Sequence, residues 1–326
     1  MLKNTGFVAI NDETTFRKEA LRLFSYQARE CEIYRKYIIN LGVDPEKVLD
    51  IESIPFMPIE FFKSFRVVTG EGQDEIIFRS SRTTGQHPSE HHVLNLTQYD
   101  CSIDKGFDLF YGKPSNYAIL ALLPSYLERN DASLVYMADR LIRRSANPSS
   151  GFFLNEYEKL IGTIKKLLGQ GQRFILLGVT FALLDLAEHN NLKIEGNIVI
   201  ETGGMKGRRK EMIREELHNY LCSKLGLTSV HSEYGMTELL SQAWSSGNGI
   251  YHPVPWMKVL SGDINDPLSA SAQGSTGILK VIDLANVNSC AFIATQDIGK
   301  VYPDGSFEVL GRLDYSEIRG CNLMAL

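Results

Sequence analysis

Apolar residues recur every three or four positions between Thr14 and Asn40, with charged residues between them. This spacing places an apolar stripe along one side of a helix, so the pattern predicts a single amphipathic helix over 14–40. A short helical piece is expected to begin at Asp44-Pro45-Glu46. The prolines of Ile54–Pro58 then favour an extended segment before Ile59–Phe65. We therefore expect residues 1–65 to form a helical segment packed on a larger domain.

Further along the chain, short apolar runs alternate with helical patterns. The runs are Tyr117–Leu123, Phe174–Leu177, Ile198–Glu201 and Thr228–Val230, and the helical patterns are Ala132–Arg143, Tyr157–Leu168 and Gly207–Leu225. Strands that alternate with helices predict parallel sheet layers in an α/β fold. Ligands of such sheets bind at the carboxyl ends of the strands, where the turns at Gly203-Gly204 and Tyr234 fall.

The last quarter of the chain has a different pattern. Gly277–Asp283, Cys290–Thr295 and Ser306–Leu310 are β-rich, and Pro303-Asp304-Gly305 has the composition of a tight turn. We expect a small β subdomain at about 250–313.

Composition narrows the class of protein. The 326 residues are 44% hydrophobic and 22% charged, with a net charge of -5 and a sequence pI near 5.9, which argues against a general basic footprint and therefore against nucleic-acid binding. Two basic runs, Arg140–Arg144 and Lys206–Lys210, are interpreted as solvated helix ends rather than as a binding patch.

The cysteines and the N-terminus bear on the compartment. The cysteines are scattered, odd in number and without a Cys-x-x-Cys pair, which favours a reducing cytoplasm over a disulfide framework; they are Cys31, Cys101, Cys222, Cys290 and Cys321. No signal-like apolar core follows Met1, and the apolar stretches are too short or too interrupted to span a bilayer. We expect a cytoplasmic protein with no membrane span.

Three segments carry candidate chemistry: Ser80–Pro88, Glu233–Glu238, and Asp297 together with Gly311–Asp314. A loop rich in hydroxyls and glycine can surround an anionic polyphosphate, because backbone N–H groups approach it closely and Ser and Thr add donors. An aromatic ring beside a carboxylate can hold a base and a Mg²⁺ ion, since carboxylate oxygen is a hard ligand. Together the segments indicate a nucleotide site.

In this order and spacing the segments resemble those of the adenylate-forming superfamily of acyl-CoA synthetases, adenylation domains and luciferases, over about residues 50–320. Within it the chain is most similar to the acyl-protein synthetases of the bacterial luminescence fatty-acid reductase system, whose lead-in segment Pro58–Lys63 resembles. The resemblance implies a large α/β adenylate-forming domain of stacked layers at 66–313, closed by the small β subdomain.

The resemblance also implies roles for individual residues. The β- and γ-phosphates of ATP would be gripped by Ser80, Ser81, Thr83, Thr84 and Gly85. Adenine would lie against Gly203 and Gly204 and stack on Tyr234, which Gly235 follows. Thr237 would bind phosphate, and Glu238 would ligate Mg²⁺. Asp297 and Arg312 would hold the ribose. Structural alternatives remain open: a plain strand-to-helix turn at Gly203, a core tyrosine beside a helix cap at 234–238, a turn aspartate and a surface arginine.

Two features depart from the superfamily pattern. Arg82 replaces a glycine of the phosphate loop and Ser89 replaces a common lysine, so Arg82 either supplies phosphate charge in catalysis or disables the loop. His87, His91 and His92 are interpreted as the tail of that loop rather than as metal ligands, because no further ligand completes a known spacing.

The C-terminal end suggests the acyl acceptor. Asp314 matches the superfamily's hinge, and the sequence stops twelve residues later, so we expect 314–326 to be a hinge remnant and tail, with the C-terminal small domain and its lysine absent. In acyl-protein synthetases a cysteine near the end accepts the acyl group, a role that Cys321 matches; the alternative is a small apolar residue ending a β segment.

The sequence therefore predicts an AMP-forming acid-thiol ligase. It would use ATP and Mg²⁺ to activate a carboxylic acid, of the fatty class, and transfer the acyl group to Cys321 or to a partner reductase or carrier protein. Two alternatives stand: an acyl- or aryl-CoA ligase without its small domain, with CoA as the acceptor, and a degenerate protein that binds nucleotide or acyl chain as an assembly partner.

Overall fold

A computed structural model describes residues 6–81, 87–123, 131–189, 192–203, 212–263 and 274–313. Several predictions concern residues outside these ranges: those for Arg82, Thr83, Thr84 and Gly85 in the phosphate loop, for Gly204, for Lys206–Lys210, for Asp314 and for Cys321.

The N-terminal helix predicted over 14–40 is wrong in one respect, because the structure has two helices there: α1 (Glu13–Glu30) and α2 (Glu32–Asn40). Cys31 between them is extended, with φ -95° and ψ 103°, and it forms an isolated antiparallel bridge with Thr69. The periodicity continues across the break, so apolar spacing alone does not reveal it. Asp12 caps α1 by accepting a 2.8 Å hydrogen bond from the Thr15 backbone N–H.

Short elements follow and lead into the main domain. They are the 3₁₀ turns η1 (Gly6–Ala9), η2 (Pro45–Lys47), η3 (Ile51–Ser53) and η4 (Pro114–Asn116), the strand β1 (Met57–Pro58), the helix α3 (Phe61–Ser64), the hairpin β2 (Ile76–Arg79) and β3 (Glu90–Val93), and the helix α4 (Leu96–Tyr111).

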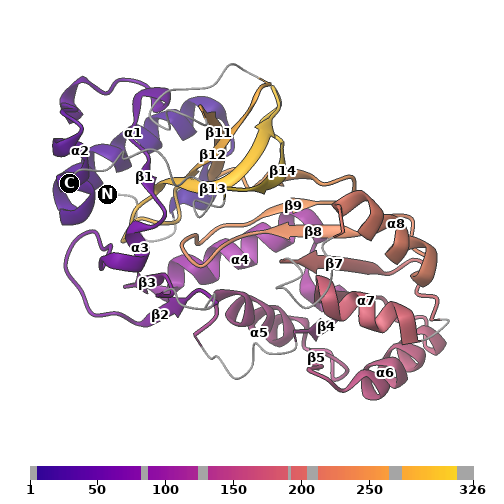
Figure 1. Ribbon diagram of the computed structural model, residues 1–326. Helices are drawn as coiled ribbons and strands as arrows, with labels where there is room; N and C mark the ends of the chain where they lie inside the picture. The colour runs from indigo at the N-terminus through magenta and orange to yellow at the C-terminus, as the bar shows by residue number, and fades with distance from the viewer. Residues whose placement is uncertain are drawn as a thin grey trace.

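The predicted parallel layer is confirmed. Its strands are β4 (Ala118–Leu122), β5 (Gly151–Phe152), β6 (Phe174–Val179), β7 (Ile198–Thr202) and β8 (His231–Tyr234), in the spatial order β8-β7-β6-β4-β5, and its helices are α5 (Ser133–Ser145), α6 (Tyr157–Gly169), α7 (Thr180–His189) and α8 (Arg214–Leu225). Every residue of β4 and β6 is buried, as expected for strands covered on both faces. Because crossovers between parallel strands are right-handed, this strand order places α6, α7 and α8 on one face of the layer and α5 on the other. The helices around the layer can be followed in Figure 1.

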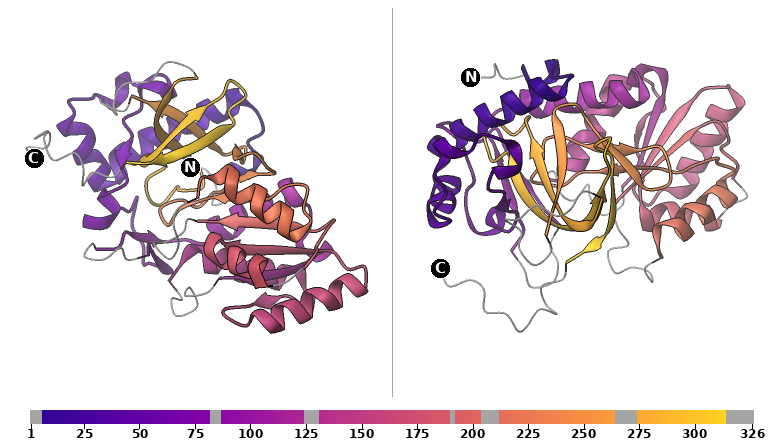
Figure 2. Two further views of the ribbon diagram at one scale, coloured as in Figure 1. Left: turned by 45° about the vertical axis from the view of Figure 1, so that its right-hand side comes forward. Right: turned by 90° about the horizontal axis from the view of Figure 1, so that it is seen from above.

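The β-rich region continues the same sheet. Strand β9 (Ala243–Ser245) pairs antiparallel with β8, and β10 (Ile250–Pro253) leads to β14 (Phe307–Arg312), β13 (Phe292–Val301), β12 (Thr276–Asp283) and β11 (Met257–Gly262). Helices α1 and α2 lie beside these last strands, and α4 to α8 lie around the parallel layer (Figure 2). The predicted α/β class is confirmed, and the β-rich region lies at about the predicted place in the sequence as an extension of the same sheet.

Helices α4 and α5 are joined by ion pairs that correct the interpretation of the first basic run. Arg140 Nη1 lies 2.8 Å from Asp100 Oδ2 and its Nε 2.6 Å from Asp104 Oδ1. Arg144 Nη2 lies 3.0 Å from Asp108 Oδ1. These side chains are not solvated helix ends, because they neutralise three carboxylates spaced four residues apart on α4.

None of the helices in the described ranges is both long and apolar enough to cross a bilayer.

Candidate functional site

Tyr234, Asp297 and Arg312, which the sequence predicts to hold adenine and ribose, lie together. Tyr234 ends β8, and its hydroxyl donates a 2.9 Å hydrogen bond to Asp297 Oδ2. Asp297 of β13 stands opposite Arg312 of β14 in the antiparallel register, and Arg312 Nε lies 4.0 Å from Asp297 Oδ1. The two predicted ribose residues therefore face each other, and Tyr234 is tied to them through its hydroxyl.

The Tyr234 ring is fixed by aromatic packing. Its centroid lies 5.1 Å from the Phe307 ring, nearly perpendicular to it at 80°, and 5.7 Å from the Tyr251 ring. Burial raises the pKa of Asp297, and the charge of Arg312 and the hydrogen bond from Tyr234 only partly offset that rise. The aspartate is thus a largely buried carboxyl whose stabilising partners are the two predicted site residues.

Glu238, the predicted metal ligand, follows in a segment whose backbone is held at several points. His91 Nδ1 donates a 2.8 Å hydrogen bond to the Thr237 carbonyl, and Asn286 Nδ2 donates one of 2.8 Å to the Glu238 carbonyl. Beyond it, Asp283 accepts hydrogen bonds from the Leu240 backbone N–H and the Ser241 hydroxyl. These bonds fix the direction in which the Glu238 side chain leaves the backbone.

Glu238 is buried, with 5% of its surface exposed. Burial raises its pKa, against the opposing effects of a hydrogen bond with Ser89 and of the positive charges of Arg312 and Lys63. A carboxylate that is withdrawn from water can bind a cation, and the two positive charges that act on it can order an anionic ligand next to it.

Two residues of the predicted phosphate loop are within the described ranges, and one of them closes the base of that loop. The Ser80 backbone N–H donates to the Ser89 carbonyl at 3.1 Å, and the Ser89 N–H donates to Ser80 Oγ at 2.8 Å. Ser81, the next residue, is exposed. Ser89 therefore connects the base of the loop to Glu238. The sequence indicated only that Ser89 replaces a common lysine and did not suggest this connection.

The histidines after that loop lie on a strand, not on a helix. His91 and His92 occupy successive positions of β3 and so face opposite sides. His91 is turned to Thr237, whereas His92 Nδ1 lies 2.8 Å from Asp74 Oδ2. Burial lowers the pKa of His91 to about 4, so it is a neutral donor at Nδ1 near neutral pH. Its contact with Thr237 gives His91 a positioning role that sequence spacing did not indicate.

Gly203 follows β7 with φ +70°, a conformation that favours glycine. The Thr180 hydroxyl contacts both the Gly203 carbonyl and the Glu201 carboxyl. The predicted adenine-side turn therefore lies at the carboxyl end of its strand, as expected from the parallel layer, next to the end of β8.

Glu233 was not predicted as a special residue, yet it is an unusual carboxyl. Thr202 Oγ1 donates a 2.9 Å hydrogen bond to Glu233 Oε2, and a Cβ at Gly235 would lie 2.3 Å from Glu233 Oε1. Burial raises the pKa of Glu233 to about 7, the neighbouring Glu201 raises it further, and the Thr202 hydrogen bond opposes both. The alternation of side chains along β8 indicates which face of the sheet Glu233 occupies. The burial of Glu233, however, depends on the surrounding tertiary structure.

Glu233→Gln should therefore flatten part of the pH dependence of stability. A carboxyl whose pKa rises from 4.5 in the unfolded chain to about 7 in the fold binds more protons when folded, so the free energy of unfolding falls as pH rises between these values. Relative to wild type, the variant should gain about 2 kcal/mol between pH 5 and pH 8, a figure reduced because the side chain is only partly buried. Urea unfolding at several pH values measures this, with exposed Glu195→Gln as control. Parallel pH curves for wild type and Glu233→Gln would show that the carboxyl is already ionised in the fold.

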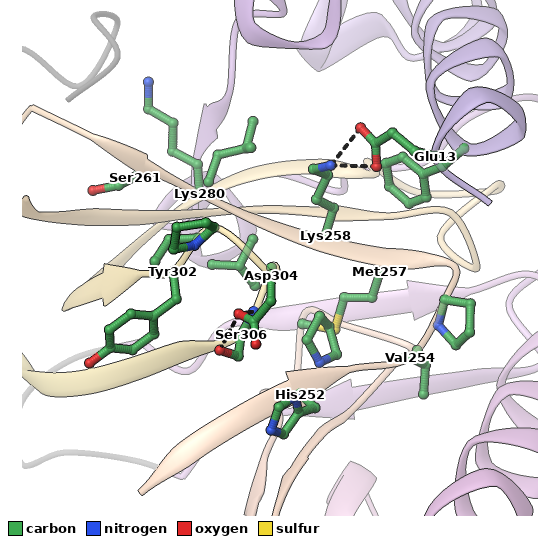
Figure 3. Close-up of a pocket in the computed structure, with 18 of the residues that line it drawn as sticks. Glu13, His252, Val254, Met257, Lys258, Ser261, Lys280, Tyr302, Asp304 and Ser306 are labelled. Atoms are coloured by element: carbon green, nitrogen blue, oxygen red, sulfur yellow. Dashed lines mark hydrogen bonds and ion pairs between the residues drawn. The ribbon is translucent and has the colours of Figure 1, made fainter. Parts of the chain in front are cut away.

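A cavity of about 810 Å³ lies elsewhere, between α1 and the strands β10 to β12. Figure 3 shows it, with Lys258 Nζ 2.7 Å from both oxygens of Glu13 and the Ser306 hydroxyl bonded to Asp304. None of the predicted nucleotide residues lines it. The cavity is therefore separate from the candidate site.

Comparison with known proteins shows which sequences the chain is similar to. No family model matches the chain. The chain is 24% identical over 330 residues to the long-chain-fatty-acid–luciferin-component ligase of Aliivibrio fischeri, covering 92% of this chain and 85% of that protein. It is 22% identical to the ligase of the same name from Vibrio harveyi, covering 92% and 84%.

Solved structures show the fold. A 2-hydroxyisobutyryl-CoA ligase in complex with 2-HIB-AMP and CoA has a TM-score of 0.67 at 12% identity, covering 92% of this chain and 68% of that one. ATP-bound MatB from Rhodopseudomonas palustris has a TM-score of 0.56 at 17% identity, covering 74% of this chain and 49% of that one. The chain has the fold of these two ligases, and its sequence similarity to the two bacterial ligases extends over most of its length.

Proposed function

We propose that this protein is an AMP-forming acid-thiol ligase that activates a carboxylic acid of the fatty class with ATP. The observation that carries the proposal is the junction of Tyr234, Asp297 and Arg312, which are hydrogen-bonded or paired across the three strands β8, β13 and β14, in a chain with the adenylate-forming fold. The fatty class rests on the names of the two bacterial relatives.

In this proposal a carboxylate oxygen of the acid forms a bond to the α-phosphorus of ATP. The bond from that phosphorus to the bridging oxygen breaks, and pyrophosphate leaves with the electron pair. A thiolate then attacks the acyl carbon and AMP leaves. Tyr234 would present its ring to adenine, and Asp297 and Arg312 would hold the ribose hydroxyls, so the α-phosphorus is oriented for attack.

The phosphate contacts belong to the hydroxyl loop and to Thr237. Ser80, Ser81, Thr83, Thr84 and Gly85 would surround the β- and γ-phosphates, in a loop whose base is closed by two hydrogen bonds between Ser80 and Ser89. Because the backbone of Thr237 is held by His91, its hydroxyl would be fixed relative to that loop.

The residues of the site fit a Mg²⁺ ion bound together with the nucleotide. Among the described residues there is no group of three or more acidic, histidine or cysteine side chains that could hold a metal alone. A site with the single buried carboxyl of Glu238 suits a cation that completes its shell with phosphate oxygens and water, as Mg²⁺ does. When bound, the ion would neutralise phosphate charge.

The acyl acceptor is proposed to be Cys321 or the thiol of a partner reductase or carrier protein. A thiolate is a better acyl acceptor than a hydroxyl. A radiolabelled acid should therefore become attached to the chain through a bond that hydroxylamine cleaves, and Cys321→Ser should abolish the label if Cys321 is the acceptor. Label released as a CoA thioester would identify CoA as the acceptor instead.

The first test is pyrophosphate exchange into ATP with short, medium and long fatty acids and aryl acids. We expect exchange that depends on one class of acid and disappears in Glu238→Ala. Folded wild-type protein that shows no exchange with any acid would overturn the proposal and favour a nucleotide- or acyl-binding partner protein.

A further inference from the structure

Lys63 is a positively charged residue at the candidate site that none of the three predicted segments contains. It lies on α3 (Phe61–Ser64), more than 170 residues before Glu238 in the sequence. Its side chain is only partly buried, and its charge reaches Glu238, where it opposes the effect of burial on the pKa of that carboxyl.

One side of α3 is attached to the predicted ribose residues. Strand β1 pairs in parallel with β13, with Pro58 opposite Ala294, and the Ile59 backbone N–H donates to the Ala294 carbonyl at 3.0 Å. Glu60 Oε1 then accepts a 2.5 Å hydrogen bond from Gln296 Nε2. Gln296 Oε1 in turn accepts from Arg312 Nη2 at 3.2 Å, so the start of α3 is connected to Arg312.

The other side of α3 is attached to the segment that carries Glu238. Phe62 is 1% exposed, and its ring meets the His91 ring edge to face, with centroids 5.7 Å apart at 83°. His91 is the residue that donates to the Thr237 carbonyl. Lys63, the next residue along α3, is therefore held between two anchored points, Arg312 on one side and Thr237-Glu238 on the other.

We infer that Lys63 is a further catalytic residue, whose ammonium group contacts the polyphosphate of ATP and stabilises the pyrophosphate that leaves. The inference rests on the proposed function. When the bond between the α-phosphorus and the bridging oxygen breaks, negative charge accumulates on the departing pyrophosphate, and a fixed ammonium beside it lowers the energy of that charge. No proton is transferred in this step. Arg312 and Lys63 thus contact different parts of the nucleotide: Arg312 binds the ribose, and Lys63 binds the phosphates.

The test compares Lys63→Gln and Lys63→Arg with wild type, and uses Lys36→Gln as the control. Lys36 is an exposed lysine of α2 whose ion pair with Glu32 lies on the same helix. Lys63→Gln should reduce acid-dependent pyrophosphate exchange about 10- to 100-fold, because one charged contact is lost at a partly exposed position. Lys63→Arg should keep most of the activity, and Lys36→Gln should match wild type.

Binding measurements separate a phosphate contact from a merely structural effect. By calorimetry, Lys63→Gln should weaken ATP binding about tenfold, as loss of one charge-assisted contact does, and leave adenosine binding unchanged. Equal weakening of ATP and adenosine, or exchange at the wild-type rate, would overturn the role of Lys63. A wild-type protein without exchange would instead refute the proposed function, and the comparison of ATP with adenosine would still decide whether Lys63 binds phosphate.

Discussion

Glu238→Gln is expected to reduce acid-dependent pyrophosphate exchange by about 100- to 1,000-fold without unfolding the protein. Glutamine has the size of glutamate and can still hydrogen-bond, but its neutral amide oxygen is a poor ligand for a hard dication. Because burial raises the pKa of Glu238, removal of its charge should not destabilise the fold. The measurements are the exchange rate over a range of Mg²⁺ concentrations and thermal unfolding of both proteins.

The matched control is Glu216→Gln, which changes an exposed glutamate of α8 in the same way. It should exchange at the wild-type rate. If Glu238→Gln keeps more than about a third of wild-type exchange at every Mg²⁺ concentration, a factor worth under 1 kcal/mol, Glu238 does not ligate the ion and the metal assignment fails.

The strands whose carboxyl ends border the site could be predicted from the sequence, because short apolar runs are a local signal. The apolar runs at 174–177 and 198–201 correspond to β6 and β7, and a parallel layer brings their carboxyl ends to one edge. The strand before Tyr234 was predicted a few residues early, at 228–230, whereas β8 is His231–Tyr234. Polar residues such as His231 and Glu233 alternate with buried ones in β8 and mask the apolar signal.

The parts that the sequence did not predict depend on contacts between distant segments. The break at Cys31 follows from its bridge to Thr69, and the place of Lys63 follows from the pairing of β1 with β13 and from the contact of Phe62 with His91. No local periodicity encodes these pairings, because each joins residues that are separated by tens to hundreds of positions. Asp297 and Arg312 were predicted from their motifs, but their register across β13 and β14 needed the fold.

Asp297→Ala should raise the KM for ATP about 30- to 300-fold, while the maximal exchange rate changes less. A hydrogen bond that a carboxylate accepts from a hydroxyl is about twice as strong as one between neutral groups. Loss of Asp297 also leaves the Tyr234 hydroxyl without its partner and removes the carboxylate paired with Arg312, which keeps its hydrogen bond to Gln296. Tyr234→Phe removes only the hydroxyl and should raise the KM about three- to tenfold.

Since that hydroxyl is hydrogen-bonded to Asp297, the effects of the two substitutions should not add: the double variant should have the KM of Asp297→Ala within about a factor of two. Initial rates of exchange at varied ATP measure all three variants. Independent, multiplicative effects would mean that the hydroxyl acts on adenine directly rather than by orienting the aspartate.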